Sequence, residues 1–167
     1  MTAKMPPPIE AVTRGPITLE MLKLYARASG DHNPIHTDEA AAKKAGLPGI
    51  IAHGMLTAGL LASRALEIMK PLDGTWEISS FQSRFKAMTF LGEMMTIAGS
   101  FKSVGDDTIC MELNASNPNG TITTQAVVEF KRRSGLLQHS DESRQRDAAG
   151  HEQRPGRGDV LVFRVIE

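Results

Sequence analysis

One stretch near the middle of the chain is apolar at nearly every position. Between Gly54 and Met69 the polar side chains are only Thr57, Ser63, Arg64 and Glu67. A helix of this length spans about 24 Å, which is roughly the width of a small domain. A helix that is apolar on every face is expected to be buried on every face. We therefore expect the rest of the fold to wrap around this helix.

The chain after this helix is rich in residues that favour strands. Strands are predicted over residues 78–90, 94–104, 108–117 and 121–131, with a short edge strand within residues 10–16. The sequence Asn117-Pro118-Asn119-Gly120 is a strong hairpin signal between the last two. Antiparallel strands joined by short turns form a sheet with one face to cover. The prediction is an α+β fold, with one antiparallel sheet wrapped around a central buried helix.

Two shorter helices precede the long one and enclose a polar loop. The first is expected to begin after Thr18 as its cap and to end at Gly30. The second is alanine-rich and covers residues 38–44, with Thr37 as its expected cap. The loop between them runs from Asp31 to His36 and contains a proline, which prevents a continuous helix there.

Composition narrows the possible partners. The 167 residues carry 19 basic and 19 acidic side chains, so no basic field attracts nucleic acid. A single cysteine, Cys110, excludes a disulfide framework and fits a reducing compartment. The N-terminus lacks the apolar segment of a secretory signal, and Pro48, His53 and several glycines interrupt the uncharged stretch 45–63. We expect a cytoplasmic protein without a nucleic-acid or membrane partner.

The C-terminal part has a different composition. No lysine follows Lys131, and a polar run extends to Asp159. We expect one domain over residues 1–133 and a disordered tail over residues 134–167. The apolar end of that tail, residues 160–166, has strong strand propensity. It is expected either to add to a sheet edge or to remain exposed.

The polar loop carries the candidate chemistry. Asp31 and His36 lie close together in a loop clamped between two helices. A carboxylate and an imidazole that share a partly dry pocket are a plausible acid/base pair, because burial brings both groups closer to neutrality. Taken alone, Asp31 is more typical of a turn or cap residue, and His36 is still more typical of a structural histidine.

A metal site is the alternative for the same loop. His32 and His36 have the spacing of a helical zinc pair. Pro34 lies between them, so the two rings cannot share a regular helical face. No cysteine is nearby, and we expect no metal.

Gly54 opens the long helix and adds a third feature. The first N–H groups of a helix lack intrahelical acceptors and lie at the positive end of its dipole. Glycine lets a ligand approach the backbone closely, so Gly54 could polarise a carbonyl oxygen. Alternatively, Gly54 provides only a tight corner between the preceding segment and the helix.

These segments together resemble a known family. The run from Tyr25 to His36, followed after five residues by Ala42 and later by Ala52-His53-Gly54-Met55, resembles the hydratase-2 motif of MaoC-like dehydratases and (R)-specific enoyl-CoA hydratases. The resemblance covers about residues 18–131. It implies a hot-dog fold, a homodimer and no cofactor.

The resemblance also implies roles for individual residues. Asp31 and His36 match the pair that activates water, and Gly54 matches the glycine whose N–H binds the thioester oxygen. Residues 83–93 resemble the family's RFKxPV-type strand, although Met88 replaces the usual proline and Glu93 the common Asp. The residues expected to bind substrate or to orient the catalytic groups are Asn33, His53, Arg84 and Lys86.

The expected function is reversible hydration of trans-2-enoyl thioesters to (R)-3-hydroxyacyl thioesters. The carrier is expected to be coenzyme A or an acyl carrier protein. Two alternatives remain open at this point. One is a hot-dog thioesterase, and the other is a non-catalytic protein that binds acyl thioesters.

Overall fold

The computed structural model describes residues 6, 8–133 and 162–166 of the chain. The helices are α1 (Leu19–Ser29), the 3-10 helix η1 (Pro34–His36), α2 (Glu39–Lys44) and α3 (Gly54–Met69). The strands are β1 (Val12–Arg14), β2 (Trp76–Phe85), β3 (Met95–Val104), β4 (Thr108–Ser116), β5 (Ile122–Arg132) and β6 (Val162–Ile166).

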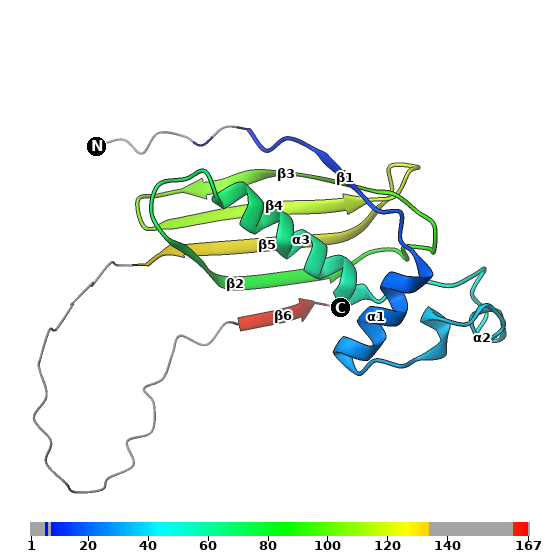
Figure 1. The fold of residues 1–167 in the computed structure, drawn as a ribbon. Coiled ribbons are helices and arrows are strands. Elements are labelled where there is room, and N and C mark those ends of the chain that lie inside the picture. The colour runs from blue at the N-terminus through cyan, green and yellow to red at the C-terminus, as the bar shows by residue number, and fades with distance from the viewer. Residues whose placement is uncertain (1–5, 7, 134–161, 167) are drawn as a thin grey trace, which may run out of the picture.

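The strands form one sheet in the order β1-β3-β4-β5-β2-β6. Neighbouring strands from β1 to β2 are antiparallel, and only the β2–β6 pair is parallel. Helix α3 lies across one face of this sheet, while α1 and α2 lie beyond one end of it (Figure 1). This is the α+β, helix-on-sheet arrangement of a hot-dog fold, as predicted.

The core lies between α3 and the sheet. The helix packs chiefly against β5, β4 and β2. It buries one face, which contains Ala58, Leu61 and Ala65, against sheet residues such as Met111 and Phe130. Among the described helices, none is long and apolar enough to cross a membrane.

The expectation that α3 is buried on every face is wrong for the single chain. Met55 is 40% exposed and Leu66 is 45% exposed. The reason is geometric, because a single sheet can cover only one side of a helix. The opposite side of α3 therefore retains apolar surface.

Most predicted boundaries agree with the structure to within a few residues. The long helix spans the predicted range, and Thr18 and Gly30 cap α1 as expected. Two expectations were wrong. Asp38, not Thr37, caps α2, because its side chain accepts a hydrogen bond from the N–H of Ala41.

The second error concerns the end of β2, which was expected at residue 90. The strand ends at Phe85, because the N–H groups of Lys86 and Ala87 both turn to the carbonyl oxygen of Thr123. Phe90 then forms an isolated antiparallel bridge with Ile51. This bridge ties the segment that enters α3 to the chain beyond β2.

The C-terminal range divides into two parts. The expected disorder does not hold for Val162–Ile166, which form β6 and pair with residues 80–84 of β2. Of the two options for this apolar end, the structure has the added sheet edge, because the edge of β2 offers unpaired backbone groups. The remainder of the predicted tail, residues 134–161 and 167, lies outside the described residues.

Candidate active site

The polar loop follows directly from the end of α1. Gly30 ends that helix in the left-handed conformation, with φ of 78°, which glycine adopts without steric cost. Asn33 then caps the 3-10 helix, since its side-chain oxygen accepts a hydrogen bond from the N–H of Ile35 at 3.3 Å. The asparagine side chain therefore holds the turn that places His36.

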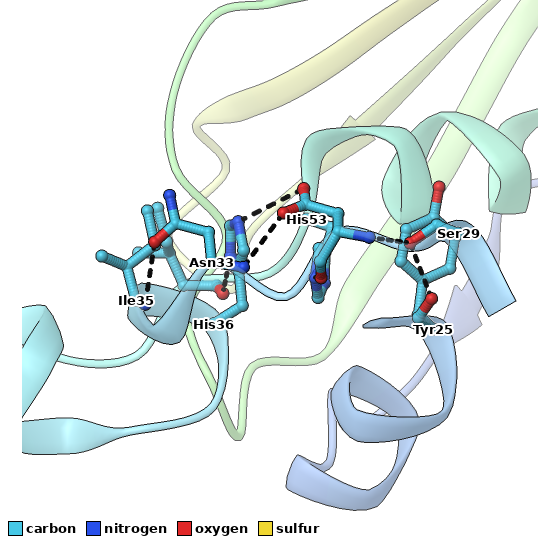
Figure 2. A network of polar contacts seen from close by, with 8 residues as sticks. Tyr25, Ser29, Asn33, Ile35, His36 and His53 are labelled. Atoms are coloured by element: carbon cyan, nitrogen blue, oxygen red, sulfur yellow. Dashed lines mark hydrogen bonds and ion pairs between the residues drawn. The ribbon is translucent and has the colours of Figure 1, made fainter. Parts of the chain in front are cut away.

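His36 is buried and its orientation is set by the backbone. Its Nδ1 lies 2.8 Å from the carbonyl oxygen of Ile51 (Figure 2). A carbonyl can only accept, so Nδ1 carries the proton and donates. In the neutral ring Nε2 then has the free lone pair. That atom lies 4.0 Å from Oδ2 of Asp31.

Two hydrogen bonds to neighbouring residues hold Asp31. Its Oδ1 accepts a hydrogen bond from the N–H of Asn33 at 3.2 Å. Its own N–H donates to Oγ of Ser29 at 3.2 Å, and that hydroxyl donates to the carbonyl oxygen of Tyr25 at 2.7 Å. These bonds leave Oδ2 directed towards His36.

Asp31 is more exposed than expected, since the sequence predicted that it shares a partly dry pocket with His36. Its side chain is 51% exposed, whereas that of His36 is only 10% exposed. In the single chain, therefore, only one member of the pair is shielded from solvent.

The gap between the two groups suits a water molecule. At 4.0 Å, Oδ2 of Asp31 and Nε2 of His36 are too far apart for a direct hydrogen bond. A water about 2.8 Å from each atom would accommodate this spacing. The pair therefore has the geometry to hold one water between two proton acceptors.

His53 packs directly behind this pair. Its ring stacks on that of His36, with centroids 3.9 Å apart, and contacts the ring of Tyr25 at 4.9 Å. Nε2 of His53 lies 3.2 Å from the carbonyl oxygen of Asp31 and donates to it. One ring thus contacts both members of the candidate pair, which is the placement of an orienting residue.

Burial has a second consequence at His53. It lowers the pKa of His53, and the hydrogen bond to the Asp31 backbone offsets this only in part. The nearby His36 lowers it further. Since Nε2–H donates, Nδ1 is a buried acceptor, and within the described residues it has no partner.

Gly54 follows His53 and begins α3. Within the described part of the chain, the N–H of Gly54 donates to no acceptor. The first turn is anchored by Thr57, whose hydroxyl donates to the carbonyl oxygen of Gly54 at 2.7 Å. Thr57 also bonds to the buried hydroxyl of Thr124 on β5 at 2.8 Å. The free amide is therefore held rigidly next to the histidine pair.

Phe85 lies next to Gly54, and its place in the site was not predicted from the sequence. A methyl group at Gly54 would lie 3.2 Å from Cε1 and Cζ of the Phe85 ring. The alternation of β2, which buries Phe81 and Ser83 on the helix side, places Phe85 on that side too. That alternation was the available signal, but the contact itself depends on how α3 crosses the sheet.

Among the described residues, the side chains of Arg84 and Lys86 form no hydrogen bond or ion pair with Asp31 or His36, the candidate pair. Both basic side chains are exposed, and alternation places Arg84 on the face of β2 opposite to Phe85. Their role in binding substrate stays a prediction.

The residues that could together bind a metal ion in the structure differ from the His32 and His36 pair considered in the sequence. Asp31, His36 and His53 place one potential ligand atom each within 4.8 Å of one another, whereas His32 is exposed. The hydrogen bonds of the two rings leave Nε2 of His36 and Nδ1 of His53 as free acceptors. The rings are stacked, with centroids 3.9 Å apart and an interplanar angle of 28°, which directs their in-plane lone pairs side by side rather than towards one ion.

Comparisons with known proteins identify the family. Residues 3–130 match the model of the MaoC like domain family. The chain is 56% identical over 55 residues to 3-hydroxyacyl-thioester dehydratase X of Mycobacterium tuberculosis, an alignment that covers 33% of this chain and 19% of the relative. The chain spans less than a third of the length of the curated relatives it matches.

Solved structures show the same fold. The (R)-hydratase from A. caviae involved in PHA biosynthesis superposes with a TM-score of 0.69 at 20% identity, covering 80% of this chain and all of that one. The ChsH1-ChsH2 complex from Mycobacterium tuberculosis gives a TM-score of 0.69 at 19% identity, covering 79% of this chain and all of the matched chain. Because the family match extends over most of the chain, the protein belongs to the MaoC-like dehydratase family.

Proposed function

We propose that this protein catalyses the reversible hydration of trans-2-enoyl thioesters to (R)-3-hydroxyacyl thioesters. The observation that carries the proposal is the pair of acceptors, Asp31 Oδ2 and His36 Nε2, set 4.0 Å apart beside the free N–H of Gly54 at the start of α3. The similarity to a 3-hydroxyacyl-thioester dehydratase supports the same chemistry.

The residues divide the reaction between them. Asp31 and His36 hold a water and remove one of its protons, while its oxygen forms a bond to C3 of the enoyl group. The electron pair of the C2–C3 double bond moves towards the thioester carbonyl, whose oxygen gains negative charge. The N–H of Gly54, at the positive end of the α3 dipole, stabilises that charge.

A proton returned to C2 completes hydration. Asp31 and His36 are the two groups able to supply it, and the same steps in reverse remove water from a 3-hydroxyacyl thioester. Asn33 and His53 position the pair, through the 3-10 turn and the stacked ring respectively. No step requires a cofactor or a metal ion.

We further propose that the working unit is a homodimer. The exposed apolar side chains of α3, Met55 and Leu66, provide a surface that association can bury. The related fold in the ChsH1-ChsH2 complex occurs in a two-component assembly. A cytoplasmic location is proposed from the single unpaired cysteine, Cys110. Sedimentation at several concentrations tests the dimer.

The direct test follows the absorbance of the conjugated enoyl thioester. Substrates are offered on coenzyme A and on acyl carrier protein, and loss of absorbance with formation of the (R)-3-hydroxy product is the expected result. Release of free thiol from a saturated acyl-CoA would indicate a thioesterase instead. A melting shift with acyl-CoA but no turnover would indicate a binding protein.

A chelator control accompanies this assay. Because the stacked rings of His36 and His53 do not direct their free lone pairs towards one point, turnover is expected to be unchanged after dialysis against a chelator. Loss of turnover that added metal restores would show that the Asp31, His36 and His53 group binds a required ion.

A further inference from the structure

Phe85 ends β2 beside the first residue of α3. It pairs with Thr124 of β5, the residue whose hydroxyl also bonds to Thr57 in the first turn of α3. The same two strands therefore hold both the helix N-terminus and the aromatic ring. Their relative position is fixed by the sheet rather than by a loop.

The Phe85 ring lies on the side of Gly54 towards which a side chain would point. A methyl group there would lie 3.2 Å from Cε1 and Cζ and 3.3 Å from Cδ1 of Phe85. Such distances are too short for comfortable packing, so the ring occupies the space that a side chain would need. Glycine at this position thus leaves room for Phe85 as well as for a ligand.

The Phe85 ring is partly open to solvent. Phe85 is 37% exposed although it lies next to the first residue of α3. Two neighbours are also exposed and apolar, namely Met55, which follows Gly54, and Met88, three residues beyond Phe85. An exposed apolar ring therefore adjoins Gly54, whose amide has no acceptor among the described residues, and this is the pattern of a site for a carbonyl attached to a hydrocarbon chain.

We propose that Phe85 is a specificity-determining residue whose ring packs against the acyl chain of the thioester bound at Gly54. The inference rests on the proposed hydratase function. A carbonyl oxygen about 2.9 Å from the Gly54 nitrogen places its attached carbons within a few ångströms of the glycine Cα. Phe85 contacts that same Cα region, so the size of its side chain limits the acyl groups that fit.

The test compares two substrates rather than one. For wild-type protein and for Phe85→Leu and Phe85→Ala, kcat/KM is measured with crotonyl-CoA and with a long-chain trans-2-enoyl-CoA. Pocket changes of this size alter discrimination by about tenfold or more. We expect the ratio of long-chain to short-chain kcat/KM to rise by about tenfold in Phe85→Ala and by less in Phe85→Leu.

Met94→Ala is the matched control. Met94 is an exposed apolar residue just before β3, and β4 and β5 separate β3 from β2 in the sheet. Its substitution should leave the substrate ratio unchanged. Melting curves for all variants separate altered discrimination from loss of folding, and Phe85→Leu serves if Phe85→Ala does not fold.

A second variant tests the contact itself. In Gly54→Ala the new methyl group meets the Phe85 ring. Gly54→Ala should therefore lower the melting temperature less in the Phe85→Leu background than in the wild-type protein. This readout requires no catalysis.

The outcomes separate the two claims. An equal change of kcat/KM for both substrates would overturn the role of Phe85 and leave the hydratase function intact. Absence of turnover by the wild-type protein on any enoyl thioester would overturn both.

Discussion

The two ends of α3 differ in how far their polar groups bond to the rest of the chain. At the C-terminal half, Glu67 bonds to Arg14 at 2.7 Å and to Arg64 at 3.3 Å, and Arg64 also donates to the carbonyl oxygen of Glu10 at 3.0 Å. Among the described residues, Nε of Arg64 is the buried polar atom of this half that lacks a partner. At the N-terminal end, within the described residues, the N–H of Gly54 has no acceptor and Nδ1 of the buried His53 has no partner.

This difference separates stability from function along one helix. Polar groups that bond to one another contribute to the folded state whether or not a ligand is present. Polar groups left free in a buried position cost stability and are retained where a ligand satisfies them. Substitutions at the N-terminal end should therefore change turnover, and those at the C-terminal half should change only the melting temperature.

The largest effect is expected at Asp31. Asp31→Asn removes a proton acceptor but keeps the shape and the hydrogen bond from Asn33, so kcat should fall by about 10² to 10⁴-fold with little change in melting temperature. Steady-state kinetics and thermal melting of the same sample provide the measurement. His36→Ala should behave similarly.

The double variant provides the check on this pair. If Asp31 and His36 act together on one water, Asp31→Asn/His36→Ala should be little slower than either single variant. Near-normal kcat in a folded Asp31→Asn protein would remove the pair from the mechanism.

Gly54→Ala should have the next largest effect. The methyl group crowds the amide where charge develops, and kcat/KM should fall by about 10²-fold, or about 2.7 kcal/mol. Stability should change much less, because the half-exposed Phe85 ring can yield and alanine favours helix. If instead stability falls and turnover per folded molecule persists, Gly54 is only a structural corner.

His53 should produce a smaller, pH-dependent effect. Burial lowers its pKa in the folded state, so the unfolded chain binds the proton more readily. Stability contributed by neutral His53 is therefore present above about pH 6.5 and declines as the pH falls below that value. The melting temperature of the wild-type protein should therefore fall as the pH is lowered below about 6.5. The melting temperature of His53→Gln should fall less over the same pH range.

An exposed histidine provides the control for this prediction. His32 follows Asp31, whose carbonyl oxygen bonds to His53, but the His32 side chain lies at the surface. His32→Gln should leave the pH dependence of melting as it is in the wild-type protein. An identical acid profile for wild type and His53→Gln would show that His53 does not contribute to it.

Glu67→Gln tests the other end of the helix and should have the smallest effect. Its partners Arg14 and Arg64 are partly exposed or close to the surface, so the ion pairs contribute no more than about 1 kcal/mol. The melting temperature should fall by a few degrees at most, with kcat/KM unchanged for both substrate lengths. A loss of turnover at normal stability would show that the two ends of α3 are coupled.

The helix and the loop chemistry were predictable because their signals are local. The apolar run marks α3 from Gly54 to Met69, and Thr18 and Gly30 have the side chains that cap a helix. Proximity along the chain brings Asp31 near His36. These features require no knowledge of distant contacts.

The remaining features depend on contacts between distant segments. The end of β2 at Phe85 follows from hydrogen bonds to Thr123, which no local pattern encodes. The stacking of His53 on His36 and the ring contact at Gly54 arise only when α3 crosses the sheet. The exposure of Leu66 likewise depends on which face of the helix the sheet covers.

The pairing of β6 with β2 has a consequence for the order in which the sheet opens. Strand β6 lies at the sheet edge and joins a partner far earlier in the chain, residues 80–84. Closing so long a loop is entropically costly, and β6 has a neighbour on one side only. Its amides should therefore exchange with deuterium early, through local opening, while those of β4 and β5 at the centre exchange only on global unfolding. Each such opening briefly leaves the backbone of β2 free to pair with another chain.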